Sequence, residues 1–290
     1  MFLLYMAVFD FLVITIVMVL SFQAHSLSSQ NLACYPNDLK ALKDFMTGLE
    51  TVIDGWNTDF SSNNCCAWTG ITCNSNSSSP SSSSSLGLDN PIQTSRVVKF
   101  ELPRKKLVGT LFESLGTMDQ LRVLNLSQNF LKGTLPVSLF HFRNLQVLDL
   151  SFNYFSGPVP ATLYLPSIQI LDLSRNLLEG YLPVSICDNN SCTIRLLNLA
   201  ANCFSGNIPI ELGSCGGSLK QLYLASNDLT GEVTEGIFRL RKLKFLNLQD
   251  NKFSGPMSKG FGSLTNLVRM DISSNGLQES SQMFFITLQC

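Results

Sequence analysis

The stretch LRVLNLSQNFLKGTLP at residues 121–136 recurs, with its first three leucines unchanged, as LQVLDLSFNYFSGPVP at 145–160. Its core, L-x-x-L-x-L-x-x-N, returns five more times, and a degenerate first copy, VVKFELPRK, ends at Lys105. Successive copies are separated by 23 to 26 residues. The asparagine that closes each copy stands at Asn129, Asn153, Asn176, Asn202, Asn227, Asn251 and Asn275.

A period in the twenties with this consensus predicts leucine-rich repeats. The L-x-L segment is strand-like, so its leucines point inward and the residue between them points to the opposite face. One copy cannot bury its own leucines, whereas stacked copies can. We therefore predict an α/β solenoid, a right-handed superhelix with a parallel β-sheet on its concave face. The recurring asparagine is expected to satisfy backbone groups buried in the turn that leaves each strand.

Four copies continue with G-x-(I/L/V)-P, as in GTLP at 133–136 and GPVP at 157–160, and later copies drift to GEVT and GPMS. Glycine permits a tight turn and proline fixes its own φ, so this segment is expected to bend the chain toward the return side of the coil. In the last copy Glu279 replaces the glycine and the pattern ends. The repeats, about eight in number, are assigned to 96–279 and an atypical tail to 280–290.

The segment before the repeats predicts a cap that covers the open edge of the first strand. Its sequence CYPNDLKALKDFMTGLE spaces apolar residues as in an amphipathic helix. The helical set is Leu39, Leu42, Phe45, Met46 and Leu49. The cap is assigned to 27–73, and the serine-rich segment 74–95 is interpreted as a flexible loop, because it has too little apolar surface to order itself.

The first 26 residues are nearly all apolar and become polar at Gln23 and His25. They predict a secretory signal peptide, and the alternative is an uncleaved membrane anchor. The many cysteines farther along favour the signal, because they suit an oxidising compartment. The expected location is the secretory pathway, then the extracellular space (apoplast) or the cell surface.

Composition excludes some functions. Lysine plus arginine number 20 against 21 aspartate plus glutamate, so no basic surface for nucleic acid is expected. No nucleophile or metalloprotease motif occurs, and His141 is interpreted as a surface or turn residue rather than a general base. The sequence thus predicts neither an enzyme nor a bound cofactor. A zinc site fits the adjacent Cys65 and Cys66 poorly, and disulfides are favoured.

The cap and the G-x-I-P repeats resemble the extracellular part of plant leucine-rich-repeat receptor kinases and receptor-like proteins. The runs RVVKFELPRKKLVGTLFESLG and LRVLNLSQNFLKGTLPVSLFHFRNLQVLDLS are similar to the start of the phytosulfokine receptors. The resemblance covers essentially the whole chain after residue 26, but only about the first third of such an ectodomain. It implies an extracellular protein or peptide ligand, and a receptor kinase or co-receptor as a partner.

The same resemblance implies that Cys34 pairs with Cys65 and that Cys66 pairs with Cys73. The sequence contains no island domain, no membrane-spanning helix after the repeats and no kinase motif, so the family's ligand-contacting residues cannot be transferred to it. Four further cysteines allow three pairings, and Cys290 is left odd. These four are Cys187, Cys192, Cys203 and Cys215.

Three sequons occur, at Asn76, Asn125 and Asn189, and each is a predicted glycan acceptor. Asn125 lies between the leucines of L-x-L, so a sugar there would cover part of the concave face. The candidate partner-binding residues of that face are Asn125, Asp149, Asp172, Asn198, Tyr223, Asn247, Arg269 and Asp271. The alternative interpretation is that these are merely solvated strand positions.

The predicted face also includes Lys99 and Glu101, and its carboxylates outnumber its cations, so it is expected to repel a sulfated anion. The leading hypothesis is a non-catalytic binding module, the front part of a receptor ectodomain or a short secreted relative. Two alternatives are a secreted inhibitor similar to the polygalacturonase-inhibiting proteins, and a truncated product without function.

Overall fold

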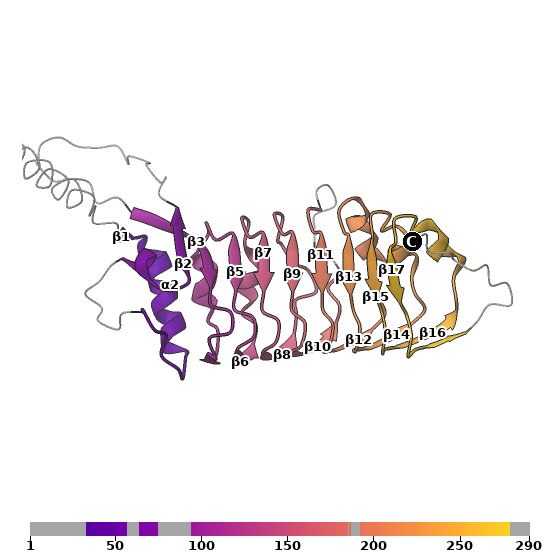
Figure 1. The fold of residues 1–290 in the computed structure, drawn as a ribbon, viewed down its shortest axis with the longest axis horizontal. Coiled ribbons are helices and arrows are strands. Elements are labelled where there is room, and N and C mark those ends of the chain that lie inside the picture. Colours follow the sequence, from indigo (N-terminus) through magenta and orange to yellow (C-terminus); the bar gives the residue numbers. More distant parts are fainter. Residues whose placement is uncertain (1–32, 57–63, 75–93, 185, 187–191, 279–290) are drawn as a thin grey trace, which may run out of the picture.

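The computed structural model describes residues 33–56, 64–74, 94–184, 186 and 192–278 (Figure 1). Several predictions fall outside these residues: the signal segment 1–26, the tail 280–290, and nearly all of the loop 74–95. The sequons at Asn76 and Asn189, with Cys187 and Cys290, also lie outside the described residues. Within the described part of the chain, no helix is long and apolar enough to cross a bilayer.

The cap consists of strand β1 (Ala33–Cys34), helix α2 (Pro36–Thr47), the 3-10 turn η1 (Cys65–Ala67) and strand β2 (Ile71–Asn74). Helix α2 begins with Pro36 at its first position, where the missing N–H costs no hydrogen bond. Phe45, on its inner face, is fully buried and packs edge-on against Phe100 of the first repeat. The helix ends at Thr47, so Leu49 lies beyond it and bridges to Gly109.

The repeats place their L-x-L segments side by side in one sheet. After β1 the strand order is β3, β5, β7, β9, β11, β13, β15 and β17, all parallel, and the cap strand β2 adds to β3 antiparallel. The eight repeat strands are β3 (Thr94–Glu101), β5 (Val123–Asn125), β7 (Val147–Asp149), β9 (Ile170–Asp172), β11 (Leu196–Asn198), β13 (Gln221–Tyr223), β15 (Phe245–Asn247) and β17 (Arg269–Asp271).

The G-x-(I/L/V)-P segments form more than the predicted turn. With the residues before them they build a second parallel sheet of eight strands. Its members are β4 (Val108–Gly109), β6 (Phe130–Thr134), β8 (Tyr154–Pro158), β10 (Leu177–Tyr181), β12 (Cys203–Gly206), β14 (Asp228–Gly231), β16 (Lys252–Pro256) and β18 (Gly276–Gln278). The turn glycine is still required: Gly157 has φ 78°, and a Cβ there would lie 3.1 Å from Thr134 Cγ2.

The return side of the coils carries short helical turns. They are η2 (Glu113–Thr117), η3 (Val137–His141), η4 (Ile210–Gly217), the α-helical turn α3 (Glu235–Phe238) and η5 (Lys259–Ser263). His141 ends η3 on the exposed surface, where its Nδ1 lies 3.0 Å from the carbonyl oxygen of Val137. The structure therefore places His141 at a surface turn, as expected.

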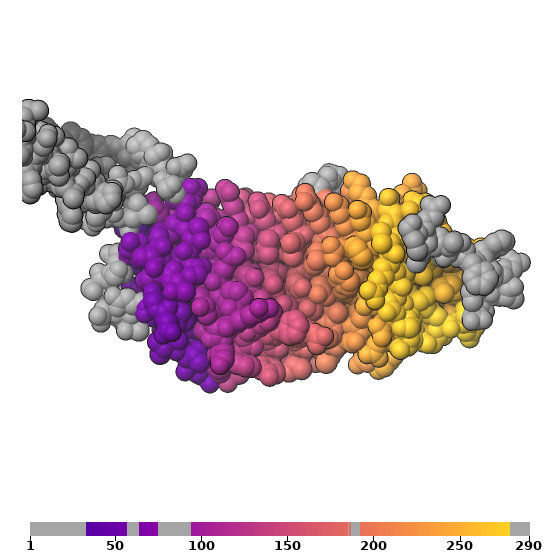
Figure 2. Space-filling model, viewed as in Figure 1, coloured from indigo at the N-terminus to yellow at the C-terminus, as the bar shows by residue number. Residues whose placement is uncertain are grey.

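One hydrophobic core runs from the cap through the stacked coils. Leu124, Leu148 and Leu171, the central leucines of three neighbouring strands, are completely buried and lie in register. In Figure 2 the coils follow one another as adjoining colour bands, and the cap adjoins the first repeats without a gap. The predicted leucine-rich-repeat solenoid, with its concave parallel sheet and disulfide-stapled helical cap, is confirmed.

Candidate functional site

The predicted outward-facing residues of the concave sheet lie side by side on neighbouring strands. Asn125, Asp149, Asp172, Asn198, Tyr223, Asn247 and Asp271 each occupy the last residue of a strand, and Arg269 begins β17. Strand pairing aligns these last residues across seven neighbouring strands. All are partly accessible, and Arg269 is exposed. The solenoid thus forms a continuous polar row across its concave face.

A second row of serines supports the acidic and amide side chains. The Oδ1 atom of Asp149 accepts hydrogen bonds from the backbone N–H (3.1 Å) and the hydroxyl (2.7 Å) of Ser151. The same pair of bonds links Asn125 with Ser127. Asp172 with Ser174 and Asp271 with Ser273 repeat it. These bonds hold the carboxylates in fixed orientations. The sequence signal for these bonds was the recurring (L/M)-(D/N)-(L/I)-S, in which the serine follows the outward residue by two positions.

Asp172 is a partly buried carboxylate of the row. Burial raises the pKa of Asp172, hydrogen bonds from Ser174 and Asn198 oppose the rise, and the nearby charge of Asp149 adds to it. Asn198 donates from Nδ2 to Asp172 Oδ2 at 3.0 Å and to the Ser174 hydroxyl at 3.1 Å. Asp149 and Asp172 stand opposite each other on adjacent strands, so negative charge is concentrated at the middle of the face.

The C-terminal part of the row is more open. Hydrogen bonds from Ser273 lower the pKa of Asp271, and the charge of Arg269 contributes to the decrease. The Tyr223 hydroxyl donates to Gln221 Oε1 at 3.1 Å, and Asn247 Oδ1 accepts from the backbone N–H of Gln249 at 3.0 Å. The face therefore changes from acidic at its centre to mixed in charge at β17.

The seven repeated asparagines lie behind this face, in the turns that leave the strands. Asn153 is typical: its Nδ2 donates to the carbonyl oxygens of Leu126 (3.0 Å) and Leu150 (3.1 Å), and its Oδ1 accepts from the Leu131 N–H at 3.0 Å. Each asparagine thereby connects its own coil to the preceding one. The Oδ1 atoms of the other six asparagines likewise accept a hydrogen bond from a backbone N–H of the preceding coil: Asn129, Asn176, Asn202, Asn227, Asn251 and Asn275. Lys105 holds the equivalent place in the first copy, and its N–H donates to Asn129.

The cap contains two disulfides, Cys34–Cys65 and Cys66–Cys73, in the pairing that the family resemblance implies. Among the described residues, Cys65, Cys66 and Cys73 place their sulfur atoms close enough to share a metal ion. All three are disulfide-bonded, so they offer no thiolate to a metal. These bonds hold η1 against β1 and β2, and thereby fix the cap on the first repeat.

Sequence reasoning missed a buried ion pair between cap and repeats. Asp38 in α2 is fully buried, and its carboxylate accepts from Arg96 Nε (3.1 Å), from Arg96 Nη2 (3.2 Å) and from the Val97 N–H (2.8 Å). Arg96 also pairs with Asp119, and its guanidinium lies over the Tyr35 ring, 4.0 Å from the centroid. The residues are far apart in the sequence, so no local pattern identified the pair.

Of the later cysteines, the sulfur atoms of Cys192 and Cys215 lie 2.9 Å apart, whereas Cys203 is exposed on β12. Burial raises the pKa of the Cys215 thiol to about 11. Cys192 is disulfide-bonded, so its approach to Cys215 is a non-bonded contact between the two sulfur atoms. The pairing among these later cysteines stays a prediction, because Cys187 lies outside the described residues.

The described sequon, Asn125, stands on β5 with its side chain in the concave row. Its Oδ1 is engaged by Ser127, which is also the third residue of the sequon. Glycosylation at Asn125 stays a prediction, and a glycan at this position would extend over the concave face.

Family models match two parts of the chain. The Leucine rich repeat N-terminal domain matches residues 36–74, and the Leucine Rich Repeat matches 120–142, 144–164, 167–189 and 242–264. These spans coincide with the cap and with four of the coils described above. The models thus recognise the same cap and repeats that the structure forms.

Phytosulfokine receptor 1 of Arabidopsis thaliana is 45% identical to this chain over 238 residues, which is 82% of the chain but 22% of the receptor. Among solved structures, PEPR1–AtPEP1 is 25% identical with a TM-score of 0.55, covering 84% of this chain and 42% of that one. The Arabidopsis receptor kinase HAESA, solved with the peptide hormone IDA and the co-receptor SERK1, is 26% identical with a TM-score of 0.54. That match covers 84% of this chain and 46% of HAESA.

The chain thus spans less than half the length of each of these proteins. Its cap with two disulfides, its G-x-(I/L/V)-P coils and its asparagine ladder agree with these similarities. The chain belongs to the leucine-rich-repeat proteins, and its cap and repeats are of the plant receptor-ectodomain type.

Proposed function

We propose that this chain is an extracellular, non-catalytic binding module that receives a peptide or protein partner on its concave face. It would form the N-terminal part of a plant receptor similar to the phytosulfokine receptors, in peptide hormone signalling. The observation that carries the proposal is the single aligned row of partly accessible polar side chains on β5 to β17. The 45% identity to phytosulfokine receptor 1 supports it.

The dimensions of the face suit an extended peptide. Eight repeat strands at a spacing of about 4.8 Å give a face roughly 34 Å long, enough for about ten extended residues. The serine bonds hold the outward carboxylates and amides in place before a partner arrives. A prearranged surface of this kind loses little side-chain entropy on binding.

Charge indicates the kind of peptide. Asp149 and Asp172 lie opposite each other at the centre of the face, and Glu101 adds a third carboxylate at β3. Such a surface attracts lysine or arginine side chains and repels anionic groups. We therefore expect this part of the receptor to favour a neutral or basic peptide segment.

A selection experiment tests the proposal. Random twelve-residue peptides displayed on phage are selected on the secreted chain, and synthetic copies of enriched peptides are titrated by calorimetry. Asp149→Lys with Asp172→Lys reverses the central charge, while Glu211→Lys with Glu235→Lys reverses exposed charges on the return side as a matched control.

Enriched peptides are expected to contain lysine or arginine and to bind the concave double variant at least about tenfold more weakly, with the control pair unchanged. Melting temperatures of both double variants confirm that each is folded. If no enriched peptide distinguishes the concave variant from its parent, the proposal is wrong.

A further inference from the structure

A second surface of the solenoid exposes large apolar side chains beside the second sheet. We name it the lateral aromatic patch. The exposed fractions of its members are 45% for Phe130, 47% for Phe152, 54% for Tyr154 and 52% for Leu177. They come from β6, β8 and β10 and from the turn before β8, so three consecutive coils build it. Gathered exposed apolar groups of this size indicate an interaction site.

The solenoid itself does not require these residues. Phe130 and Tyr154 are each the first residue of a second-sheet strand. In two later coils the first strand residue is Asp228 or Lys252, and these two form an ion pair at 2.5 Å. The place of Phe152, just before a repeated asparagine, is taken by Ser226 in a later coil with the same left-handed backbone. Because charged or small residues serve equally well there, packing does not explain the aromatic side chains.

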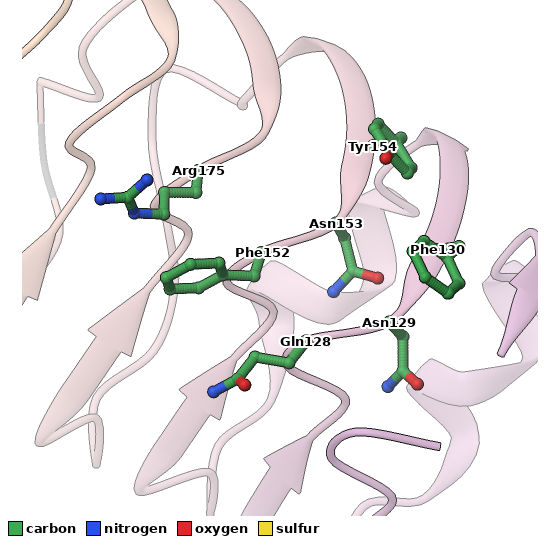
Figure 3. Close-up of a pocket in the computed structure, with 7 residues that line it drawn as sticks. All are labelled: Gln128, Asn129, Phe130, Phe152, Asn153, Tyr154 and Arg175. Atoms are coloured by element: carbon green, nitrogen blue, oxygen red, sulfur yellow. The ribbon is translucent and has the colours of Figure 1, made fainter. Parts of the chain in front are cut away.

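The rings and a guanidinium line one hollow (Figure 3). The Phe130 and Tyr154 rings are nearly parallel, with an angle of 17° and centroids 6.2 Å apart. The guanidinium carbon of Arg175 lies 4.9 Å from the centroid of the Phe152 ring. A contact of this kind with a ring does not use up the N–H groups of the guanidinium, which stay available to a carboxylate. Among the described residues, none of the ion pairs involves Arg175.

Charge along the adjoining turn is one-sided. In each coil, the residue directly before the repeated asparagine has a left-handed backbone; in the first coil Lys105 takes the place of the asparagine. In the first four coils these left-handed residues are Arg104, Gln128, Phe152 and Arg175. A carboxylate first appears in this series at Asp250. Arg104 donates from Nε to Gln128 Oε1 at 2.6 Å, which fixes the amide at the edge of the hollow. The N-terminal half of this edge is therefore cationic and aromatic, whereas the concave row beside it is acidic.

We propose that the lateral aromatic patch docks a protein partner that presents a carboxylate beside an apolar side chain. Phe130, Phe152 and Leu177 have no polar atoms, so they gain free energy only from a partner that removes water from them. Arg175 supplies paired donors for the carboxylate at the edge of that dry contact. Tyrosine and arginine are among the residue types that contribute most to the binding energy of protein interfaces. This docking is separate from the binding proposed for the concave face.

The test repeats the phage selection on the chain that carries Asp149→Asn and Asp172→Asn, so that the concave face favours neither basic nor acidic peptides. We expect enriched peptides with aspartate or glutamate next to leucine or an aromatic residue. Calorimetry of a synthetic copy should show binding about tenfold weaker for Arg175→Gln and weaker still for Phe152→Ser. Ser226→Gln, at the equivalent turn of a later coil, should leave the affinity unchanged.

Phe152→Ser places serine where Ser226 already stands in a later coil, so the variant should fold, and its melting temperature checks this. The proposal fails if no such peptide is enriched, or if the enriched peptides bind Phe152→Ser as tightly as the parent. It also fails if the patch instead binds uronic-acid oligosaccharides, with binding lost in Phe152→Ser. Self-association that is abolished by Phe152→Ser in analytical ultracentrifugation would assign the patch to a second copy and contradict it as well.

Discussion

Asp38 of the cap helix is completely buried and holds Arg96 of the first repeat through two hydrogen bonds, at 3.1 and 3.2 Å. A buried carboxylate is tolerated only when it is paired, so each residue depends on the other. Asp38→Asn should therefore lower the free energy of unfolding by about 3 kcal/mol, because Arg96 loses its buried counter-ion. Urea unfolding followed by tryptophan fluorescence measures this.

The control for this change is Asp228→Asn. Asp228 and Lys252 form an ion pair on the surface, with both side chains more than half exposed. Its loss should cost less than about 1 kcal/mol, since water replaces the partner. Equal costs for Asp38→Asn and Asp228→Asn would show that the junction between cap and repeats does not depend on the buried pair.

The asparagine ladder makes a second prediction. Asn153→Ala removes two donors and one acceptor that serve buried backbone groups of two coils. The free energy of unfolding should fall by about 1 to 3 kcal/mol for the groups left without partners. Gln128→Ala, which changes an exposed residue at a position filled by Ala201 in another coil, should be nearly neutral. A melting temperature of Asn153→Ala equal to that of the parent would contradict the ladder's role.

The concave carboxylates predict two opposite pH dependences. Because burial raises the pKa of Asp172 in the folded state, its carboxylate destabilises the fold at neutral pH, and this penalty disappears as pH falls through the raised pKa. Asp172→Asn should therefore stabilise the chain at pH 7 relative to the parent, with the gain shrinking at acidic pH. Unfolding in urea between pH 7 and pH 4 gives the difference.

Asp271 should behave in the reverse sense, because hydrogen bonds from Ser273 lower its pKa. Its carboxylate contributes stability above the unfolded pKa, and that contribution is lost as pH falls through the folded pKa. Asp271→Asn should thus destabilise the chain at pH 7, with the loss vanishing at acidic pH. The same direction of change for both variants would contradict the assigned causes.

Two cysteines should differ in reactivity. Cys203 is exposed, whereas Cys215 is buried and its pKa is raised to about 11, which suppresses the reactive thiolate. Iodoacetamide applied to the native chain should modify Cys203 and leave Cys215 unmodified in peptide mass spectrometry. Unfolding the chain under reducing conditions should make both accessible. Native modification of Cys215 at the rate of Cys203 would be inconsistent with its burial.

The sulfated-peptide expectation is also testable. Carboxylates outnumber cations on the concave face, so a tyrosine-sulfated peptide should not bind this chain detectably in calorimetry. Tight, saturable binding would show that the described repeats suffice for an anionic ligand and that the net charge of the face does not decide its selectivity.

The features that the sequence predicted are those whose residues recur in every coil. Leu124 and Leu148 identify the concave strands by their spacing, and Asn153 identifies the turn. They recur because every coil must bury its leucines against its neighbours and pair the same buried backbone groups. The second sheet was missed because its pairing depends on the coil stacking that brings Gly133 beside Phe155. The pair of Asp38 with Arg96 was missed because its partners meet only after the cap has folded onto the first repeat.

The most direct test of the account is a crystal structure of the secreted chain bound to a basic peptide from the first selection. We predict an extended peptide lying across the concave strands, with a lysine or arginine side chain between Asp149 and Asp172. A peptide seated on the return-side turns, or on the lateral aromatic patch with the concave row left open, would contradict the assignment of the concave face as the binding surface.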